Sequence, residues 1–408
     1  MPTLRSRPRS TTRRRFWVSV GLLWLAGLGL RLTILAVPPV IAPIQTDLDL
    51  SGTEIGVLSG LPVILFASAA LPGSLLIGRF GPLPTLVTGL IVAGIASGLR
   101  GAVLNVYALY AATVLMSAGV AIMQPSLPPL VRQWLPDRVS FGTALYSNGL
   151  LVAETLVVML TIPLVLPMVG NSWRLSLAVW GIPLIAIASV IVMFAPRPER
   201  DAAIRPANGS NWWPDWRSPW IWQIGFVFGS INSSYFCSNA YLPGHLTAAG
   251  RPDLIGVALT ALNFGQLPAS FVLLAIAGRL ERRAWPFIAC GALMLLCLTG
   301  IASTANLWTV FFAGSLGFLC GFGMTLGFAL PALLSRPAET ARMSAAMFTI
   351  SYSEALVISV LSGAAWDIAG NPRFAFLPIA ASALPLLFVP AAIRFGRPAD
   401  CKPWPTSS

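Results

Sequence analysis

Twelve long apolar stretches limit what this 408-residue chain can fold into more than any other feature. Each has about the length that an α-helix needs to cross a bilayer, roughly 20 residues. Only 10% of the residues are charged, against about 25% in soluble domains, so the chain lacks the polar surface of a water-soluble protein. We therefore expect an all-α membrane protein with 12 transmembrane helices embedded in a lipid bilayer. The predicted spans cover residues 17–43, 53–77, 83–100, 104–131, 141–166, 173–195, 219–243, 254–278, 285–303, 307–334, 343–366 and 374–393.

The basic residues are divided unevenly between the two sides of these spans. The formal net charge is +12, from 26 Lys and Arg against 14 Asp and Glu, and such a balance can indicate nucleic-acid binding. Here 21 of the basic residues lie in the two tails and in the loops on the same side, and only four lie in the loops on the other side. Basic loops mark the cytoplasmic side of a membrane protein. We therefore predict an inner (plasma) membrane protein with both termini cytoplasmic and no nucleic-acid partner.

The sequence holds few residues that could build a catalytic or metal centre. His245 is the only histidine, and the five cysteines show no metal-ligand spacing. No Walker-type phosphate loop is present, and the longest connecting segment, residues 197–217, is too short for a soluble output domain. We therefore expect no enzymatic activity, no cofactor and no metal site, and the sequence does not support a membrane enzyme or a signalling receptor.

The two halves of the chain repeat one another at a shift of 200 residues, or 204 in one region. Short matches fall at equivalent points of spans 1 and 7, 2 and 8, and 5 and 11. The matched positions are Pro43 and Pro243, Ile55-Gly56-Val57 and Ile255-Gly256-Val257, Gly78-Arg79 and Gly278-Arg279, and Arg138 and Arg342. Parallel repeats of this kind are found in transporters built from two pseudo-symmetric halves. The predicted units are a basic cytoplasmic tail (1–16), an N-terminal six-helix half (17–196), a cytoplasmic linker (197–217), a C-terminal six-helix half (218–394) and a cytoplasmic tail (395–408).

This arrangement of six plus six helices with both termini inside resembles the major facilitator superfamily, in which two halves rock around a site near the midplane. The family's loop after span 2 reads roughly Gly-x-Leu-x-Asp-Arg-x-Gly-Arg-Arg, and the aligned segment keeps Leu76, Arg79 and Gly81. The resemblance implies a gating loop at Arg79 and Gly81, with Arg279 in the second copy. Gly78 replaces the Asp, which removes one partner of the gating salt bridge that the family would have.

Longer runs are similar to the cyanate transporter family, whose members are identified as transporters of cyanate and, in one branch, as exporters of 2-nitroimidazole. The runs are residues 31–40 (RLTILAVPPV), 55–63 (IGVLSGLPV), 127–139 (LPPLVRQWLPDRV) and 173–174 (WR). The resemblance covers most of the chain. It implies the family and leaves the substrate open.

Three ionisable residues lie near the centres of predicted spans, where charges are costly and usually functional. They are Arg31, Glu154 and Glu354. The guanidinium of Arg31 is always charged and planar, so it suits a small anion. Its alternative role is a structural ion pair with one of the two glutamates. The resembled family also has an arginine at this point of span 1, followed by a Pro-containing segment, which favours substrate binding.

Glu154 and Glu354 are candidate proton carriers. Burial disfavours a charged carboxylate and a nearby cation favours it, so a glutamate beside Arg31 could exchange a proton with changes in substrate occupancy. The alternative is a contact between helices, since spans 5 and 11 usually flank the site in this fold. The sequence does not decide which glutamate would carry the proton.

Polar side chains on several spans are further candidates for substrate binding. Residues three or four apart share a helix face, although each polar group could equally hold neighbouring helices together. The candidates are Trp24 in span 1, Gln124 in span 4, Tyr146 in span 5, Asn232, Tyr235 and Asn239 in span 7, and Asn263 in span 8.

The function that these features favour is secondary active transport of a small anionic solute, cyanate-like or a small carboxylate, by alternating access. A proton is the candidate co-substrate, and we expect a monomer. The alternative is a proton-coupled exporter of neutral or cationic drug-like compounds such as nitroimidazoles, with a glutamate as the counter-charge.

Overall fold

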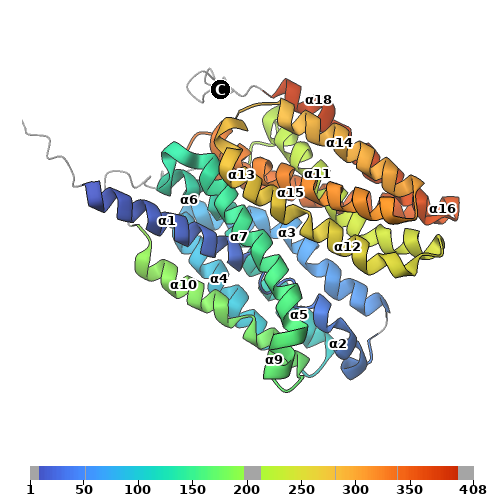
Figure 1. The fold of residues 1–408 in the computed structure, drawn as a ribbon. Helices are drawn as coiled ribbons and strands as arrows, with labels where there is room; N and C mark the ends of the chain where they lie inside the picture. Colours follow the sequence, from blue (N-terminus) through green and yellow to red (C-terminus); the bar gives the residue numbers. More distant parts are fainter. Residues whose placement is uncertain (1–8, 51, 197–212, 281, 338, 394–408) are drawn as a thin grey trace, which may run out of the picture.

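The computed structural model describes residues 9–50, 52–196, 213–280, 282–337 and 339–393, and the regular elements in these ranges are all helical (Figure 1). The first half of the chain contains α1 (Arg9–Gly29), α2 (Ile41–Leu48), α3 (Gly52–Phe80), α4 (Pro82–Arg100), α5 (Val106–Met123), α6 (Leu127–Trp134), α7 (Val139–Leu160), α8 (Leu166–Met168), α9 (Trp173–Val179) and α10 (Ile182–Phe194). The second half contains α11 (Pro219–Ala248), α12 (Ile255–Phe264), α13 (Gln266–Leu280), α14 (Trp285–Ser303), α15 (Leu307–Leu334), α16 (Thr340–Ala369), α17 (Phe376–Ala383) and α18 (Pro385–Ala392).

Ten helical stretches in the described part of the chain are long and apolar enough to cross a membrane. They coincide with ten of the twelve predicted spans. The two other spans are the first and the seventh, which occupy the same position in the two repeats. Span 7 is the 30-residue helix α11, whose many Ser and Asn residues lower its hydropathy. Span 1 is interrupted.

The interruption of span 1 differs from the continuous helix that the apolar run 17–43 predicts. Helix α1 ends at Gly29, residues 30–37 form turns, and a short 3-10 turn (Pro38–Val40) leads into α2. The pair Pro38-Pro39 accounts for the later part of the interruption, because each proline lacks a backbone donor and clashes with the carbonyl four residues earlier, so a regular helix cannot run through residues 34–39. Since α1 ends at Gly29, Arg31 lies just after a helix end and not inside a helix.

The helices α1–α10 and α11–α18 gather on opposite sides of the molecule (Figure 1). Within the first group α1 packs on α7, and within the second α11 packs on α16. The two groups meet where α3 packs against α16, and where α7 packs against α13 and α15. Glycine allows the close approach of α1 to α7, since a Cβ on Gly27 would collide with the backbone of Tyr146. The limits of the linker stay a prediction, because residues 197–212 lie outside the described ranges.

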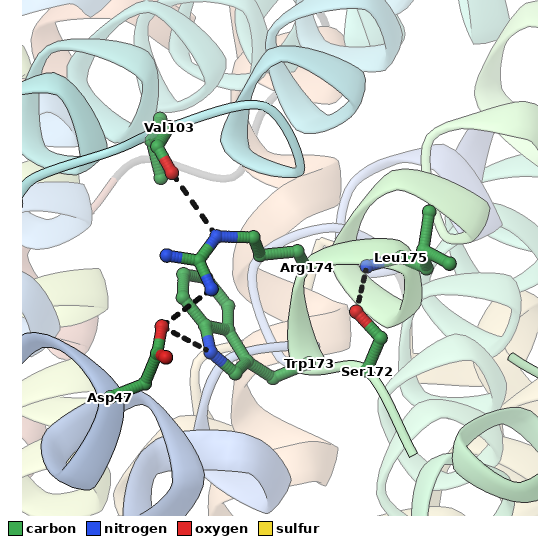
Figure 2. A network of polar contacts seen from close by, with 6 residues as sticks. All are labelled: Asp47, Val103, Ser172, Trp173, Arg174 and Leu175. Atoms are coloured by element: carbon green, nitrogen blue, oxygen red, sulfur yellow. Dashed lines mark hydrogen bonds and ion pairs between the residues drawn. The ribbon is translucent and has the colours of Figure 1, made fainter. Parts of the chain in front are cut away.

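A polar network ties three outer segments of the first group together (Figure 2). The carboxylate of Asp47 in α2 accepts hydrogen bonds from Arg174 Nη1 at 2.5 Å and from Trp173 Nε1 at 3.2 Å, at the start of α9. Arg174 Nε also donates to the Val103 carbonyl at 3.1 Å, between α4 and α5. Ser172 caps α9 through its hydroxyl. The network anchors α2, and with it the far end of the interrupted span.

Candidate functional site

The segment 30–37 determines where Arg31 lies. The amides of Leu30 and Arg31 donate to the carbonyls three residues earlier, those of Gly27 and Leu28, at 3.1 and 3.2 Å. The backbone thus tightens after α1 and then leaves the helical path before Pro38. Arg31 is buried, with 8% of its surface exposed. A buried cation on interrupted backbone is typical of ion and substrate sites in membrane transporters.

Arg100 supports this segment from the end of α4. Its Nη2 donates to the Thr33 carbonyl at 2.8 Å and to the Ser97 hydroxyl at 2.9 Å. The orientation argument counted Arg100 as a loop residue on the non-cytoplasmic side, where its side chain would be exposed. In the structure Arg100 is completely buried. The reason is the broken helix, because a carbonyl freed from its helical bond needs another donor.

Arg31 lies between the two groups of helices. Its electrostatic neighbours are Glu154 of α7, Tyr235 of α11 and Tyr352 of α16, and the ring of Phe66 in α3 lies 5.9 Å from its guanidinium carbon. Among the described residues no ion pair joins Arg31 to a carboxylate, and its Nε is buried without a hydrogen-bond partner. The ion pair with a glutamate, the alternative role of Arg31, is therefore not formed in this structure.

Glu154 belongs to a hydrogen-bonded chain that crosses between the halves. The Tyr235 hydroxyl lies 2.7 Å from Glu154 Oε1 and 2.6 Å from Asn263 Oδ1. Asn263 Nδ2 donates to Asn239 Oδ1 at 2.9 Å and to the Leu259 carbonyl at 2.8 Å. The predicted polar faces of spans 7 and 8 thus meet each other and reach span 5. We call Arg31, Glu154, Tyr235, Asn263 and Tyr352 the central cluster.

Tyr352 is a member of the central cluster that sequence reasoning missed. Its hydroxyl accepts a hydrogen bond from Gln124 Nε2 at 3.2 Å, and its ring lies 5.0 Å from that of Phe66. Gln124 and Phe66 belong to the first half and Tyr352 to the second. The available signal was the position of Tyr352 two residues before Glu354, on the opposite side of the same helix.

Glu354 and Asn232 lie apart from this chain, at the contact of α11 with α16. The Oε2 atom of Glu354 is buried without a partner and packs against Gly229. Asn232 donates to the Ser351 hydroxyl at 2.7 Å. The predicted stripe on α11 therefore divides, since Asn232 bonds to α16 whereas Tyr235 and Asn239 bond to Asn263.

Trp24 and Tyr146 are placed in packing contacts between helices. Trp24 Nε1 donates to Asn148 Oδ1 at 3.0 Å, and Asn148 Nδ2 donates across the halves to the Ser270 hydroxyl at 2.9 Å. The ring of Tyr146 lies 5.6 Å from that of Phe328 in the other half. Both candidates thus lie where α7 packs on its neighbours, and neither is among the residues that surround Arg31.

The two halves are also joined at the end of the bundle where α6 and α15 finish. Arg132 donates to the carbonyls of Ala332 and Ser335. The predicted gating residues Arg79 and Arg279 are exposed. Gly81 has a φ of 90° at the turn between α3 and α4. Sequence reasoning used Arg132 only as an orientation marker, although it lies in the run 127–139 that carried the family resemblance.

Comparison with known proteins places the chain in a family. The sequence profile of the Major Facilitator Superfamily matches residues 21–250. The cyanate transport protein CynX of Escherichia coli is 24% identical over 86% of this chain and 90% of its own length. The 2-nitroimidazole transporter of the same species is 25% identical over 88% and 90%, and the uncharacterized transporter YycB of Bacillus subtilis is 25% identical over 85% and 84%.

Solved structures agree on the fold. The transporter FucP in its outward conformation superposes with a TM-score of 0.68 at 14% identity, covering 92% of this chain and 98% of FucP. The proton:xylose symporter XylE gives a TM-score of 0.72 at 12% identity, covering 92% and 95%. The matched profile spans more than half of the sequence, and the chain therefore belongs to the Major Facilitator Superfamily of membrane transporters, which are not enzymes.

Proposed function

We propose that this protein is a secondary active transporter of a small monovalent anion, cyanate-like or a small carboxylate, and that Arg31 binds the anion. The single observation that carries the proposal is a buried guanidinium between the two halves without a carboxylate partner among the described residues. An uncompensated buried charge is expensive, so a negative ligand that supplies the missing charge binds there with a large gain.

The surroundings of Arg31 suit a small and planar anion. Phe66 and Tyr352 place two aromatic rings beside the guanidinium, and Gln124 brings an amide group from the first half. The groups come from both halves, so rocking of one half against the other changes the contacts of the bound anion. This is the arrangement that alternating access requires. The name of CynX supports cyanate as the first anion to test.

A second candidate function is export of neutral or cationic compounds such as nitroimidazoles. The observation that favours it is the unpartnered Oε2 of Glu354, which could serve as a counter-charge, and the name of the 2-nitroimidazole transporter supports it. This function requires Glu354 and leaves Arg31 dispensable. Efflux of 2-nitroimidazole that survives Arg31→Ala and disappears in Glu354→Gln would establish it in place of the anion.

We also propose the membrane arrangement that the basic loops predict. The termini and the Arg132 contact face the cytoplasm of an inner-membrane monomer, so that Arg132 closes the cytoplasmic end in this conformation. The loops of Arg79, Gly81 and Arg279 lie on the same face, and the two six-helix halves comprise residues 17–196 and 218–394.

The test is a thermal-shift screen of purified protein with sodium cyanate, formate, acetate and nitrate at two pH values. An anion at 100 times its dissociation constant stabilises the folded state by about 2.7 kcal/mol. We expect one of these anions to raise the unfolding temperature of the wild type and of the exposed control Arg373→Ala, and to have no effect on Arg31→Ala. A full anion response in Arg31→Ala would refute the proposed site.

A further inference from the structure

The hydroxyl of Tyr235 faces two acceptors with a single proton. It lies 2.7 Å from Glu154 Oε1 and 2.6 Å from Asn263 Oδ1, and both are hydrogen-bond distances. A phenolic hydroxyl can donate only one hydrogen bond. In one of the two short oxygen–oxygen contacts the proton must therefore come from the partner of Tyr235, either Glu154 or Asn263.

Asn263 cannot supply that proton. Its amide nitrogen donates to the Leu259 carbonyl at 2.8 Å, and a backbone carbonyl can only accept. Rotating the amide by a half-turn would set two oxygens against each other there, so the orientation of the Asn263 side chain is fixed by its surroundings. The Asn263 atom that faces Tyr235 is consequently an oxygen, which takes the Tyr235 proton.

The remaining contact, between Tyr235 and Glu154, then requires a proton on the carboxyl group. We propose that Glu154 is protonated in this conformation and donates to the Tyr235 hydroxyl, which donates to Asn263, so that Tyr235 relays the protonation state of Glu154 to the second half. This inference rests on the proposed function only where it concerns the transported anion.

The neutral form of Glu154 follows from the donor count at Tyr235 and not from the surrounding charges. Arg31 is the charged member of the central cluster and has Glu154, Tyr235 and Tyr352 as its titratable neighbours, and a cation by itself favours the carboxylate. The elements packed against α7 add no charge at this level. Helix α15 has none, the arginines of α1 lie in its first two turns, and α6 and α13 carry Arg132 and Arg279 near their last turns. The 3-10 turn before α7 carries Asp137 and Arg138, at the opposite end of α7 from Glu154. Arg31 thus lacks an ionised partner here and is available for an anion.

Release of the proton would exchange one partner of Arg31 for another. The O–H bond of Glu154 breaks and the proton passes to water, while the Tyr235 hydroxyl turns from Asn263 to the new carboxylate. Glu154 can then balance Arg31 after the anion has left. The cluster carries no net charge either as Arg31 with the anion and neutral Glu154, or as Arg31 with the carboxylate. One proton therefore moves with one monovalent anion, and the cycle is electroneutral.

The protonation of Glu154 can be tested without a substrate. The infrared difference spectrum between the purified wild type and Glu154→Gln at neutral pH should contain a protonated-carboxyl band, which is separate from any band of the buried Glu354. The Glu154 band should persist in the control Glu339→Gln, whose carboxylate is paired with Arg342. In Tyr235→Phe the band should remain and shift to higher frequency, because its hydrogen-bond acceptor is lost. A spectrum unchanged by Glu154→Gln, or a band that Tyr235→Phe does not move, would overturn the inference.

Proteoliposomes test the coupling with cyanate, formate and nitrate as probes. An inward proton gradient should drive accumulation that is insensitive to membrane potential. Glu154→Gln, whose amide imitates the protonated carboxyl, should lose at least tenfold in acid-driven accumulation relative to the control Glu339→Gln. Potential-driven uptake would contradict the one-to-one balance. Absence of transport with every probe would count against the proposed anion and leave the infrared result on Glu154 standing, so the two failures can be told apart.

Discussion

Spans 1 and 7 occupy the same place in the two repeats and are built in opposite ways. At a shift of 200 residues, Pro38-Pro39 aligns with Ser238-Asn239, and Arg31 aligns with Ile231. Span 1 breaks after Gly29, whereas α11 continues through the equivalent positions without interruption. The shared pair Pro43 and Pro243 does not cause the difference, and Pro38-Pro39 is a helix-breaking feature of span 1 that span 7 lacks.

The difference explains why span 1 contributes a cation to the central cluster and span 7 contributes neutral polar groups. A broken helix frees backbone carbonyls and lets a cation leave the helix surface, and it needs support such as that of Arg100. A continuous helix holds Tyr235 and Asn239 at a fixed spacing on one face. The central cluster combines both, with Arg31 from the first half and Tyr235 from the second.

Replacing Arg31 by its counterpart is expected to have the largest effect. In Arg31→Ile the positive charge of the central cluster is removed, and truncating a buried charge partner costs about 2–5 kcal/mol, a loss of affinity of roughly 30-fold or more. Isothermal titration with the anion found in the thermal-shift screen measures it. Ile231→Leu, at the equivalent position of the second half, is the control and should bind the anion with the affinity of the wild type. Equal affinities of Arg31→Ile and the wild type would contradict the proposed site.

Breaking span 7 at the equivalent position should have the next largest effect. Ser238→Pro removes a donor from the middle of α11 and should destabilise the protein by about 3 kcal/mol, measured as a lower unfolding temperature in detergent. Ser238→Ala is the matched control, since the Ser238 hydroxyl makes no hydrogen bond. If Ser238→Pro is as stable as Ser238→Ala, span 7 tolerates the same break as span 1 and the contrast between the repeats has no energetic basis.

Apolar length was enough to predict the membrane helices, and the role of Arg31 stays a prediction. Apolar length is a local feature of the sequence, and ten of the predicted spans are confirmed as membrane-length helices. The break in span 1 was missed because an apolar run of sufficient length looks continuous, although Pro38-Pro39 was a signal for it.

The composition of the site was harder to predict, because it depends on which helices touch. Tyr352 and Arg132 meet partners more than 200 residues away in the chain, and no periodicity indicates such pairs. For the same reason the sequence could not decide between Glu154 and Glu354 as the proton carrier. The tertiary structure distinguishes them, because Glu154 of α7 bonds to Tyr235 of α11, whereas Glu354 faces Gly229.

Removing the support of the broken segment should have an intermediate effect. Arg100→Gln leaves the Thr33 carbonyl without its donor, which costs about 1–3 kcal/mol for a buried polar group. We expect a lower unfolding temperature together with weaker anion binding, because the segment also holds Arg31. Arg373→Gln, an exposed arginine, is the control and should change neither quantity. Unfolding at lower temperature with unchanged affinity would show that Arg100 stabilises the fold and does not position Arg31.

The smallest effect is expected on the face of α11, where the continuous helix contributes to the cluster. Asn239→Ala removes the acceptor of Asn263, and a net hydrogen bond is worth about 1 kcal/mol, so anion affinity should fall roughly fivefold. Asn232→Ala is the matched control on the same helix, because Asn232 bonds to Ser351 and not to the cluster. It should lower the unfolding temperature and leave affinity unchanged. The reverse pattern would place the functional face of α11 toward α16, and would make Glu354 rather than Glu154 the carboxyl group that works with span 7.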